Sequence, residues 1–185
     1  PTAGALHAVV ADHVIGGRVV VPASAFLEMA RASYCAAVDA SSDAAKLYAV
    51  AFMMPLVLQS GDASMMLEIT RDQASGAFEA RSIDVTATDG SDAPTHCAGE
   101  SQAAPGVFPM TAGGIAAKRA QSNAAVDLDT QYKLRHAAGL HYGPAFQELQ
   151  RAWVLGDEAS AVSQLRYEAT PRGMAVSPAA FDAAL

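Results

Sequence analysis

The sequence predicts an α+β fold in which a long helix packs against antiparallel strands. Apolar residues recur at helical spacing from Ser24 to about Ala40, and apolar and polar residues alternate from Lys46 to about Ala104. A shorter pattern of helix and strands follows after residue 125. A helix and a sheet that each have one apolar face bury those faces together, which gives a layered α+β arrangement.

Composition narrows the range of functions. Hydrophobic residues make up 51% of the chain, so its 185 residues can bury a sizeable core. No apolar run is long enough to span a bilayer, and no secretion signal is visible. The two cysteines, Cys35 and Cys97, predict no disulfide framework and a cytoplasmic location. A net charge of −7 without any Lys/Arg cluster argues against nucleic acid or an anionic membrane as a partner.

The first helix is predicted to be buried. Pro22 precedes it, and Ser24 is its predicted N-cap. Most of its circumference is apolar, and its polar residues form one narrow stripe of Glu28, Arg31, Cys35 and Asp39. A helix of this kind is usually surrounded by other structure.

The alternating region predicts several strands. Residues 47–58 form a long apolar stretch with Pro55 near its centre, which indicates an interrupted or edge strand. Residues 65–70 alternate and predict a half-buried strand. The apolar phase then changes, which predicts a bulge near Ser82.

Beyond this point the pattern changes twice. Asp89-Gly90 predicts a turn, and Thr95–Ala103 predicts another strand. Prolines and glycines are scattered through residues 105–125, which predicts a linker.

The C-terminal part partly repeats the order of the first. A short helix is predicted at 129–138, followed by strands at 149–155 and 159–167. Ser177 and Pro178, an N-cap and a first-turn proline, predict the start of a last helix. The repeated order predicts two related units, the second of them incomplete.

Three short motifs carry a resemblance to a known family. In chain order they are His13-x3-Gly17-x4-Pro22, Tyr142-Gly143-Pro144-Ala145-Phe146-Gln147 and Pro178-Ala-Ala-Phe-Asp182-Ala-Ala-Leu185. The separation of 169 positions from His13 to Asp182 (182 − 13) is also similar to the family's spacing. Together the motifs resemble the dehydratase domains of modular polyketide synthases and of related fatty-acid synthases.

The resemblance implies a double hot-dog fold, in which two units each wrap an antiparallel sheet around a long helix. Residues 1–104 would form the N-terminal hot-dog unit, 105–125 the linker, and 126–185 an incomplete C-terminal unit. The active site would lie between the two units.

The resemblance also implies an activity. The substrate would be a 3-hydroxyacyl thioester on an acyl carrier protein, and the products a trans-2-enoyl thioester and water. The implied partners are the acyl carrier protein, the other synthase domains of the same polypeptide, and a second copy of the chain in a homodimer. No cofactor is implied beyond the phosphopantetheine that carries the substrate. No metal is expected either, because the histidines and cysteines lack the spacing of a zinc site.

The residue types suit this chemistry. Histidine titrates near neutrality, so His13 is the predicted base for the proton beside the thioester carbonyl. Asp182 lies among apolar residues, which favour the protonated form of a carboxyl group, and it is the predicted acid for the leaving hydroxyl. A backbone N–H near Gly17 and the start of the first helix are predicted to stabilise the developing enolate. The predicted substrate-binding residues are Gly17, Pro22, Tyr142, Gly143, Pro144 and Phe146.

The residues alone leave other interpretations open. In the non-catalytic interpretation, Asp182 faces solvent on an amphipathic helix, and Tyr142 is an ordinary packed aromatic residue. In the same interpretation, Gly17 and Pro22 have a backbone role only, and shape the turn that leads into the first helix. The same His/Asp pair would also suit an isomerase or a product-template-type cyclase.

A non-catalytic scaffold domain is a further alternative. The chain departs from the family pattern at two positions: Ala23 stands where many relatives have glycine, and Ser177 stands where relatives commonly have histidine. Retention of both His13 and Asp182 favours an enzyme over a scaffold.

Overall fold

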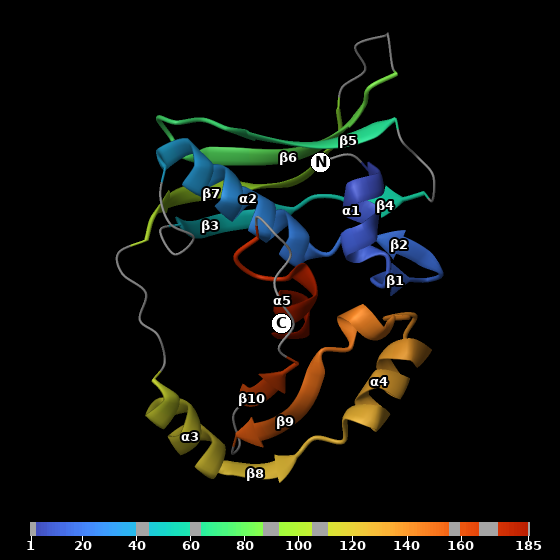
Figure 1. Cartoon of the computed structure of the whole chain (residues 1–185), viewed down its shortest axis with the longest axis vertical. Helices are drawn as coiled ribbons and strands as arrows, with labels where there is room; N and C mark the ends of the chain where they lie inside the picture. The colour runs from blue at the N-terminus through green and yellow to red at the C-terminus, as the bar shows by residue number, and fades with distance from the viewer. Residues whose placement is uncertain are drawn as a thin grey trace.

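Helix α2 (Ala23–Val38) is the centre around which the first half of the chain is arranged (Figure 1). The computed structural model describes residues 3–39, 45–59, 64–86, 93–104, 111–155, 160–166 and 174–184. Within these ranges, α2 packs on a four-stranded sheet and also contacts the last helix, α5 (Pro178–Ala184). Helix α5 therefore lies where the two halves of the chain meet.

The described strands form three antiparallel sheets. The largest has the order β3-β7-β6-β5, with β3 (Ala45–Phe52), β5 (Met65–Arg71), β6 (Ala77–Asp84) and β7 (Thr95–Ala103). The second has the order β1-β2-β4, with β1 (Val14–Ile15), β2 (Arg18–Val20) and β4 (Val57–Leu58). The third has the order β10-β9-β8, with β8 (Ser122–Ala125), β9 (Leu149–Leu155) and β10 (Ser160–Leu165).

The prediction for α2 is confirmed along most of the helix and corrected at its start. Pro22, in an extended conformation (φ −71°, ψ 154°), occupies the N-cap position, and Ser24 lies inside the first turn. The Ser24 hydroxyl is buried and makes no hydrogen bond with any residue that the structure describes, so it is not a cap. At the other end, the Asp39 N–H makes a last helical hydrogen bond to the Cys35 carbonyl, and the left-handed conformation of Asp39 (φ 49°, ψ 45°) then ends the helix. Residues 36–38 are exposed, so burial stops before the last turn.

The apolar face of α2 packs into a core formed with the largest sheet. Its buried members are Val10, Val21, Ala25, Phe26, Ala30, Leu56, Leu58, Leu67, Phe78, Ala80 and Cys97. Burying a side chain of the size of Phe or Leu contributes roughly 1.5–3 kcal/mol. This core keeps the N-terminal end of α2 fixed, and with it the residues that precede the helix.

The predicted strands of the first half are confirmed. Strand β3 lies at the edge of its sheet and ends at Phe52. After Pro55, the chain enters β4, which pairs with β2 in a different sheet, so the apolar stretch is interrupted as expected. Strand β5 alternates between buried or half-buried and exposed side chains, and β7 has the predicted bounds.

The predicted bulge lies slightly earlier than expected. The β6–β7 register changes between Ala80 and Arg81, and the extra residue, His96, belongs to β7. A phase change in β6 alone could not reveal on which strand the extra residue lies. The His96 ring is buried, and its Nε2 lies 2.9 Å from the Ser82 hydroxyl. The predicted turn at Asp89-Gly90 lies outside the described residues.

The prediction of a linker over residues 105–125 is corrected from Thr111 onward. Helix α3 (Ala112–Ala120) begins there, because the Thr111 hydroxyl accepts a hydrogen bond from the Gly114 N–H (3.1 Å) and caps the first turn. Strand β8 follows directly and pairs with β9, so it belongs to the third sheet. Gly113 and Gly114 lie in the first turn of this capped helix and do not interrupt it.

The second half contains the predicted elements with small shifts of their ends. Helix α4 (Leu128–Ala137) is capped by Asp127, and Gly139 follows it in a left-handed conformation (φ 91°). A single 3₁₀ turn, η2 (Pro144–Phe146), leads into β9, which has the predicted bounds, and α5 begins at Pro178 as predicted. In the described part of the chain, no helix is both long and apolar enough to cross a membrane.

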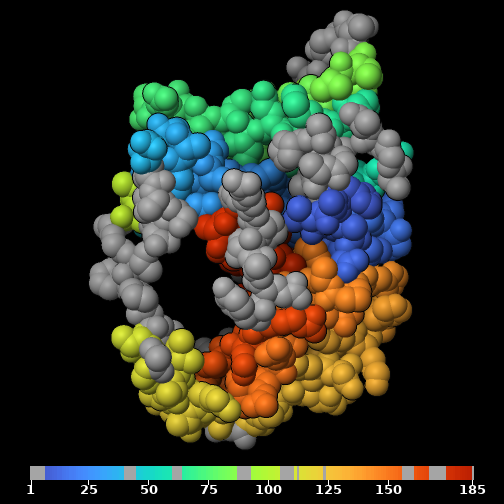
Figure 2. All heavy atoms as spheres, in the orientation of Figure 1, coloured from blue at the N-terminus to red at the C-terminus, as the bar shows by residue number. Residues whose placement is uncertain are grey.

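The N-terminal segment meets the second half directly. Helix α1 (Ala3–Val10), which the sequence did not predict, leads into the β1–β2 hairpin. The space-filling view shows this blue segment against the orange residues that precede and begin β9 (Figure 2). Ile15 forms an isolated antiparallel bridge with Leu140, so the contact involves the backbone of both halves.

Candidate active site

A tight hairpin fixes the orientation of His13. Gly16 (φ 56°) and Gly17 (φ 77°) both adopt left-handed conformations, as a two-residue hairpin turn requires. This turn folds β2 back so that the Val20 carbonyl lies 2.7 Å from Nδ1 of His13. Because a carbonyl only accepts hydrogen bonds, Nδ1 carries the proton, and Nε2 of the neutral ring is free to accept one.

Helix α5 brings Asp182 to the same place. Its Oδ1 lies 3.9 Å from Nε2 of His13. The His13 side chain is 6% exposed and the Asp182 side chain 15%. The separation exceeds that of a hydrogen bond, so neither group occupies the other's hydrogen-bonding capacity. Two residues from opposite ends of the chain thus form a shielded pair of a base and a carboxyl group.

Tyr142 is the third polar member of the site. Its ring is half-buried beside the His13 imidazole, and it lies close enough to Asp182 for the two groups to interact electrostatically. Burial, followed by the nearby negative charge of Asp182, raises the pKa of Tyr142 to about 12. The phenol therefore stays protonated near neutral pH and acts as a hydrogen-bond donor.

Aromatic rings flank His13. The ring centroids of Tyr142 and Phe146 each lie 5.1 Å from that of the imidazole. Phe146 is among the most deeply buried side chains of the described residues, whereas Pro144 is exposed. Of the second motif, Tyr142 and Phe146 therefore reach the pair, and Gly143 and Pro144 shape the backbone between them.

Gly17 and Pro22 have conformational roles in the structure. Gly17 lies in the exposed hairpin turn, and no hydrogen bond between it and His13 or Asp182 is found among the described residues. Pro22 is fully buried at the N-cap of α2. Their contact with a substrate stays a prediction, as does the use of an N–H near Gly17 to stabilise an enolate.

Two carboxylates that the sequence did not single out as site residues hold these elements in place. Glu28, buried in α2, accepts hydrogen bonds from Arg31 Nε (2.8 Å) and from the Ala175 N–H (2.7 Å), shortly before α5. Asp12, next to His13, accepts one from the Ala145 N–H (2.8 Å). A charged residue on an otherwise apolar helix could have marked Glu28 as a residue that needs a buried partner. The sequence could not identify that partner, because Ala175 lies 147 residues away.

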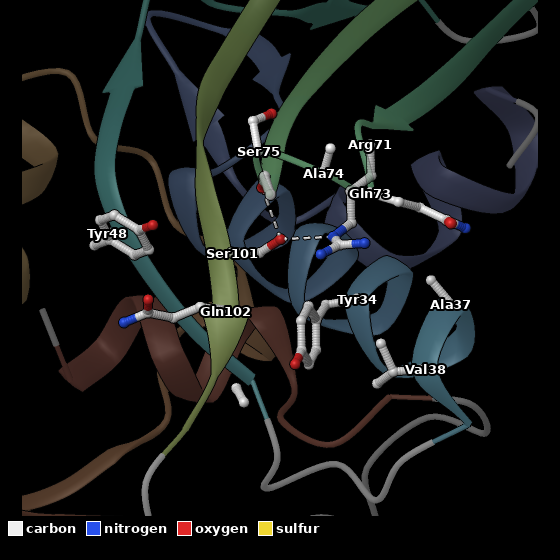
Figure 3. A pocket seen from close by; sticks show the side chains of 12 residues that line it. Tyr34, Ala37, Val38, Tyr48, Arg71, Gln73, Ala74, Ser75, Ser101 and Gln102 are labelled. Atoms are coloured by element: carbon white, nitrogen blue, oxygen red, sulfur yellow. Dashed lines mark hydrogen bonds between the residues drawn. The ribbon is translucent and has the colours of Figure 1, made fainter.

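A separate polar hollow of about 420 Å³ lies at the C-terminal end of α2 (Figure 3). Arg71 lines it, donating from Nε to the Ser101 hydroxyl (2.9 Å) and lying 4.9 Å above the Tyr34 ring. None of the residues that line the hollow belongs to the three sequence motifs. It is therefore distinct from the His13–Asp182 site.

The arrangement at His13 and Asp182 suits paired proton transfer. A base and a carboxyl group less than 4 Å apart can remove a proton from one atom and deliver one to a nearby atom of the same molecule. Across the described ranges, no group of three or more His, Cys, Asp or Glu side chains is placed to hold a metal ion.

Two family models match the chain one after the other. One is described as the polyketide synthase dehydratase domain and matches residues 2–83. The other is described as the polyketide synthase dehydratase N-terminal domain and matches residues 111–185. The chain belongs to the polyketide synthase dehydratase family. The resemblance drawn from the three motifs is confirmed.

Curated relatives of this dehydratase domain are far longer than the chain. Polyketide synthase ThaG of Burkholderia thailandensis is 33% identical over 180 residues, which cover 95% of the chain and 3% of the relative. Erythronolide synthase EryA2 of Saccharopolyspora erythraea is 31% identical over 180 residues, which cover 94% of the chain and 5% of the relative. The chain thus spans a small part of each relative.

Solved dehydratase domains share the fold. The dehydratase domain from the CurF module of curacin polyketide synthase has a TM-score of 0.77 at 19% identity, over 96% of this chain and 64% of that one. The dehydratase domain of PpsC from Mycobacterium tuberculosis has a TM-score of 0.73 at 24% identity, over 95% and 61%. The predicted α+β hot-dog fold is confirmed, and the chain spans less than two thirds of these solved domains.

Proposed function

We propose that this dehydratase domain removes water from a 3-hydroxyacyl thioester carried on the phosphopantetheine arm of an acyl carrier protein. The main support is the position of His13 and Asp182, whose side chains lie 3.9 Å apart and largely shielded from solvent. Elimination of water from a 3-hydroxyacyl group needs a base at one carbon and an acid at the hydroxyl of the next carbon. The pair supplies both groups at suitable spacing.

In the proposed reaction, Nε2 of His13 takes the proton from the carbon beside the thioester carbonyl. The electron pair of that C–H bond forms the new carbon–carbon double bond, and the bond to the 3-hydroxyl breaks. Asp182 supplies the proton with which the hydroxyl leaves as water. His13 then holds one extra proton and Asp182 lacks one, so transfer from Nε2 to Oδ1 restores both groups.

The neighbours of the pair support these roles. The Val20 carbonyl, which accepts from Nδ1–H at 2.7 Å, stabilises the imidazolium that forms when Nε2 is protonated. The Tyr142 phenol, which lies near Asp182 and stays neutral, offers the pair a further hydrogen-bond donor. Phe146 covers the imidazole and keeps water from it.

The lengths of the relatives support a place inside a larger synthase. We infer that the domain works in the cytoplasm with other synthase domains of the same polypeptide, and that the assembly is a homodimer. Polyketide synthase ThaG and erythronolide synthase EryA2, of which the chain spans 3% and 5%, are consistent with such a setting.

Incubation with a carrier-protein-bound 3-hydroxyacyl thioester tests the proposal. We expect a time-dependent mass decrease of one water molecule, together with the absorbance of an enoyl thioester, and neither change with His13→Ala. An unchanged mass with altered absorbance would instead indicate isomerisation or cyclisation by the same pair. No change with any carrier-bound 3-hydroxy substrate would indicate a scaffold domain and contradict the proposal.

A further inference from the structure

Asp12, the residue immediately before His13, holds the loop that carries Tyr142 and Phe146. Its main-chain carbonyl accepts a hydrogen bond from the Gly143 N–H at 2.8 Å. Its carboxylate oxygen Oδ2 accepts one from the Ala145 N–H, also at 2.8 Å. A single residue of the first half therefore binds two backbone positions of the second half, 131 and 133 residues away (143 − 12 and 145 − 12).

Gly143 lies directly against this carboxylate. Its backbone angles (φ −76°, ψ 175°) are open to any residue, so conformational freedom does not explain a glycine here. A Cβ at this position would lie 2.4 Å from Cγ of Asp12, and 2.6 and 2.7 Å from its two oxygens. The lack of a side chain at residue 143 is what allows the loop to approach the Asp12 carboxylate.

The same loop places both aromatic rings against His13. Tyr142 precedes Gly143, Phe146 follows Ala145, and both ring centroids lie 5.1 Å from the imidazole. Further backbone bonds tie the hairpin to this segment, from Gly16 N–H to the Gly139 carbonyl and from His141 N–H to the Val14 carbonyl. The bond from the Ala145 N–H to the Asp12 carboxylate adds a side-chain contact to these main-chain bonds, directly next to the proposed base His13.

We propose that Asp12 is a positioning residue, whose carboxylate holds the Tyr142–Phe146 loop so that the rings of Tyr142 and Phe146 lie against His13. The effect on turnover rests on the proposed dehydration. The structural effect does not, because it concerns only the contact between the hairpin and the loop.

The first test compares two substitutions of Asp12 in the dehydration assay. Asp12→Ala removes the acceptor for the Ala145 N–H, and we expect the single-turnover rate to fall between about ten-fold and a hundred-fold, the size of effect that a displacement of about 1 Å produces. Asp12→Asn keeps an acceptor oxygen, and we expect it to stay within about three-fold of the wild type, which corresponds to a change of only about 0.6 kcal/mol. Equal losses for both would overturn the proposal.

A matched control separates positioning from stability. Asp72 accepts hydrogen bonds from the Ala74 and Ser75 N–H groups in the turn after β5, far from the motifs. Asp72→Ala is expected to lower the unfolding midpoint without changing the turnover rate. If Asp72→Ala slows turnover as much as Asp12→Ala, the effect of Asp12 is only structural and the proposal fails.

A double-substitution cycle tests the contact itself. We expect Gly143→Ala to lower both the turnover rate and the unfolding midpoint, because its Cβ meets the Asp12 carboxylate. In an Asp12→Ala background that carboxylate is absent, so Gly143→Ala should cost little more. Additive effects of the two substitutions would contradict the proposed packing.

A spectroscopic readout does not depend on activity. Ultraviolet titration, taken as the difference between each protein and its Tyr142→Phe counterpart, reports the ionisation of Tyr142. Loosening the loop should move the pKa of Tyr142 from about 12 toward its ordinary value in Asp12→Ala but not in Asp72→Ala. An unchanged titration would overturn the positioning role. A wild type that does not dehydrate its substrate would overturn the proposed function and leave this result standing.

Discussion

Tyr142 links burial and charge at the proposed site. Its pKa is raised from 10.0 to about 12, chiefly by burial and then by Asp182. A phenol that ionises at higher pH in the folded than in the unfolded chain stabilises the fold fully below pH 10. That contribution is lost as the pH rises toward 12, because the unfolded chain then releases the proton first.

We therefore predict a specific pH dependence for Tyr142→Phe. The stability difference between the wild type and this variant should be constant below pH 10 and should shrink between pH 10 and 12. Urea unfolding at a series of pH values measures it, and the remaining tyrosines and lysines cancel because both proteins contain them. A difference that does not change with pH would contradict the raised pKa.

At this scale the sequence indicated the chemistry but not the geometry. His13 and Asp182 stand in motifs whose residue types suggest a base and an acid. Their 3.9 Å separation depends on how α5 packs against α2, which periodicity cannot show. For Gly17, the motif predicted a substrate-binding residue, whereas the structure places it in the hairpin turn, where its left-handed conformation explains the glycine. The role of Asp12 depends on a loop far along the chain.

At the scale of elements, Glu28 connects α2 to the segment before α5. It is 5% exposed and accepts from Arg31 and from the Ala175 N–H. The hydrogen bond with Glu28 also raises the pKa of the Arg31 guanidinium. Removing the carboxylate leaves a backbone N–H and a guanidinium without this acceptor.

We predict that Glu28→Ala lowers the free energy of unfolding by about 2 kcal/mol, the range for removing one partner of a half-buried polar network. Glu28→Gln, which keeps an acceptor for Ala175, should lose less. Glu68→Ala, on an exposed position of β5, is the control and should stay within about 0.5 kcal/mol of the wild type. Urea denaturation measures all three, and equal losses for Glu28→Ala and Glu68→Ala would rule out the connection.

The elements themselves differed in how far they could be predicted. Helix α2 and strands β5 and β7 have long, regular periods, so their existence and type followed from the sequence. A linker was expected over residues 105–125 from their prolines and glycines, and the cap at Thr111 that starts α3 was not part of that prediction. Helix α1 and the η2 turn are short, and they are fixed by contacts that form only in the folded chain.

At the scale of the whole molecule, the two halves are joined by the β1–β2 hairpin and by α5. Ile15 pairs with Leu140 across the halves, and α5 contacts both α2 and β10. The motifs could predict that an active site lies between two units. The sheet orders and the backbone bonds that join the halves required the structure.

These connections predict a single cooperative unfolding transition. The one tryptophan, Trp153, lies in β9 and reports on the second half through its fluorescence. Cys35 and Cys97 are buried in the first half, and burial raises the pKa of the Cys97 thiol to about 11, so it reacts slowly until that half unfolds. We expect tryptophan fluorescence and thiol labelling to give the same denaturation midpoint. Two separate midpoints would show that the halves unfold independently.

The central claim is that His13 and Asp182 act together in the elimination of water. Single-turnover rates of the wild type, the two single variants, the double variant and two control variants test it most directly. We expect His13→Ala and Asp182→Asn each to slow the reaction by about 10²–10⁴-fold, and the double variant to be little slower than the slower single variant. His136→Ala and Asp129→Asn, at exposed positions of α4, should retain the wild-type rate. A folded His13→Ala or Asp182→Asn variant with near wild-type turnover would contradict the account.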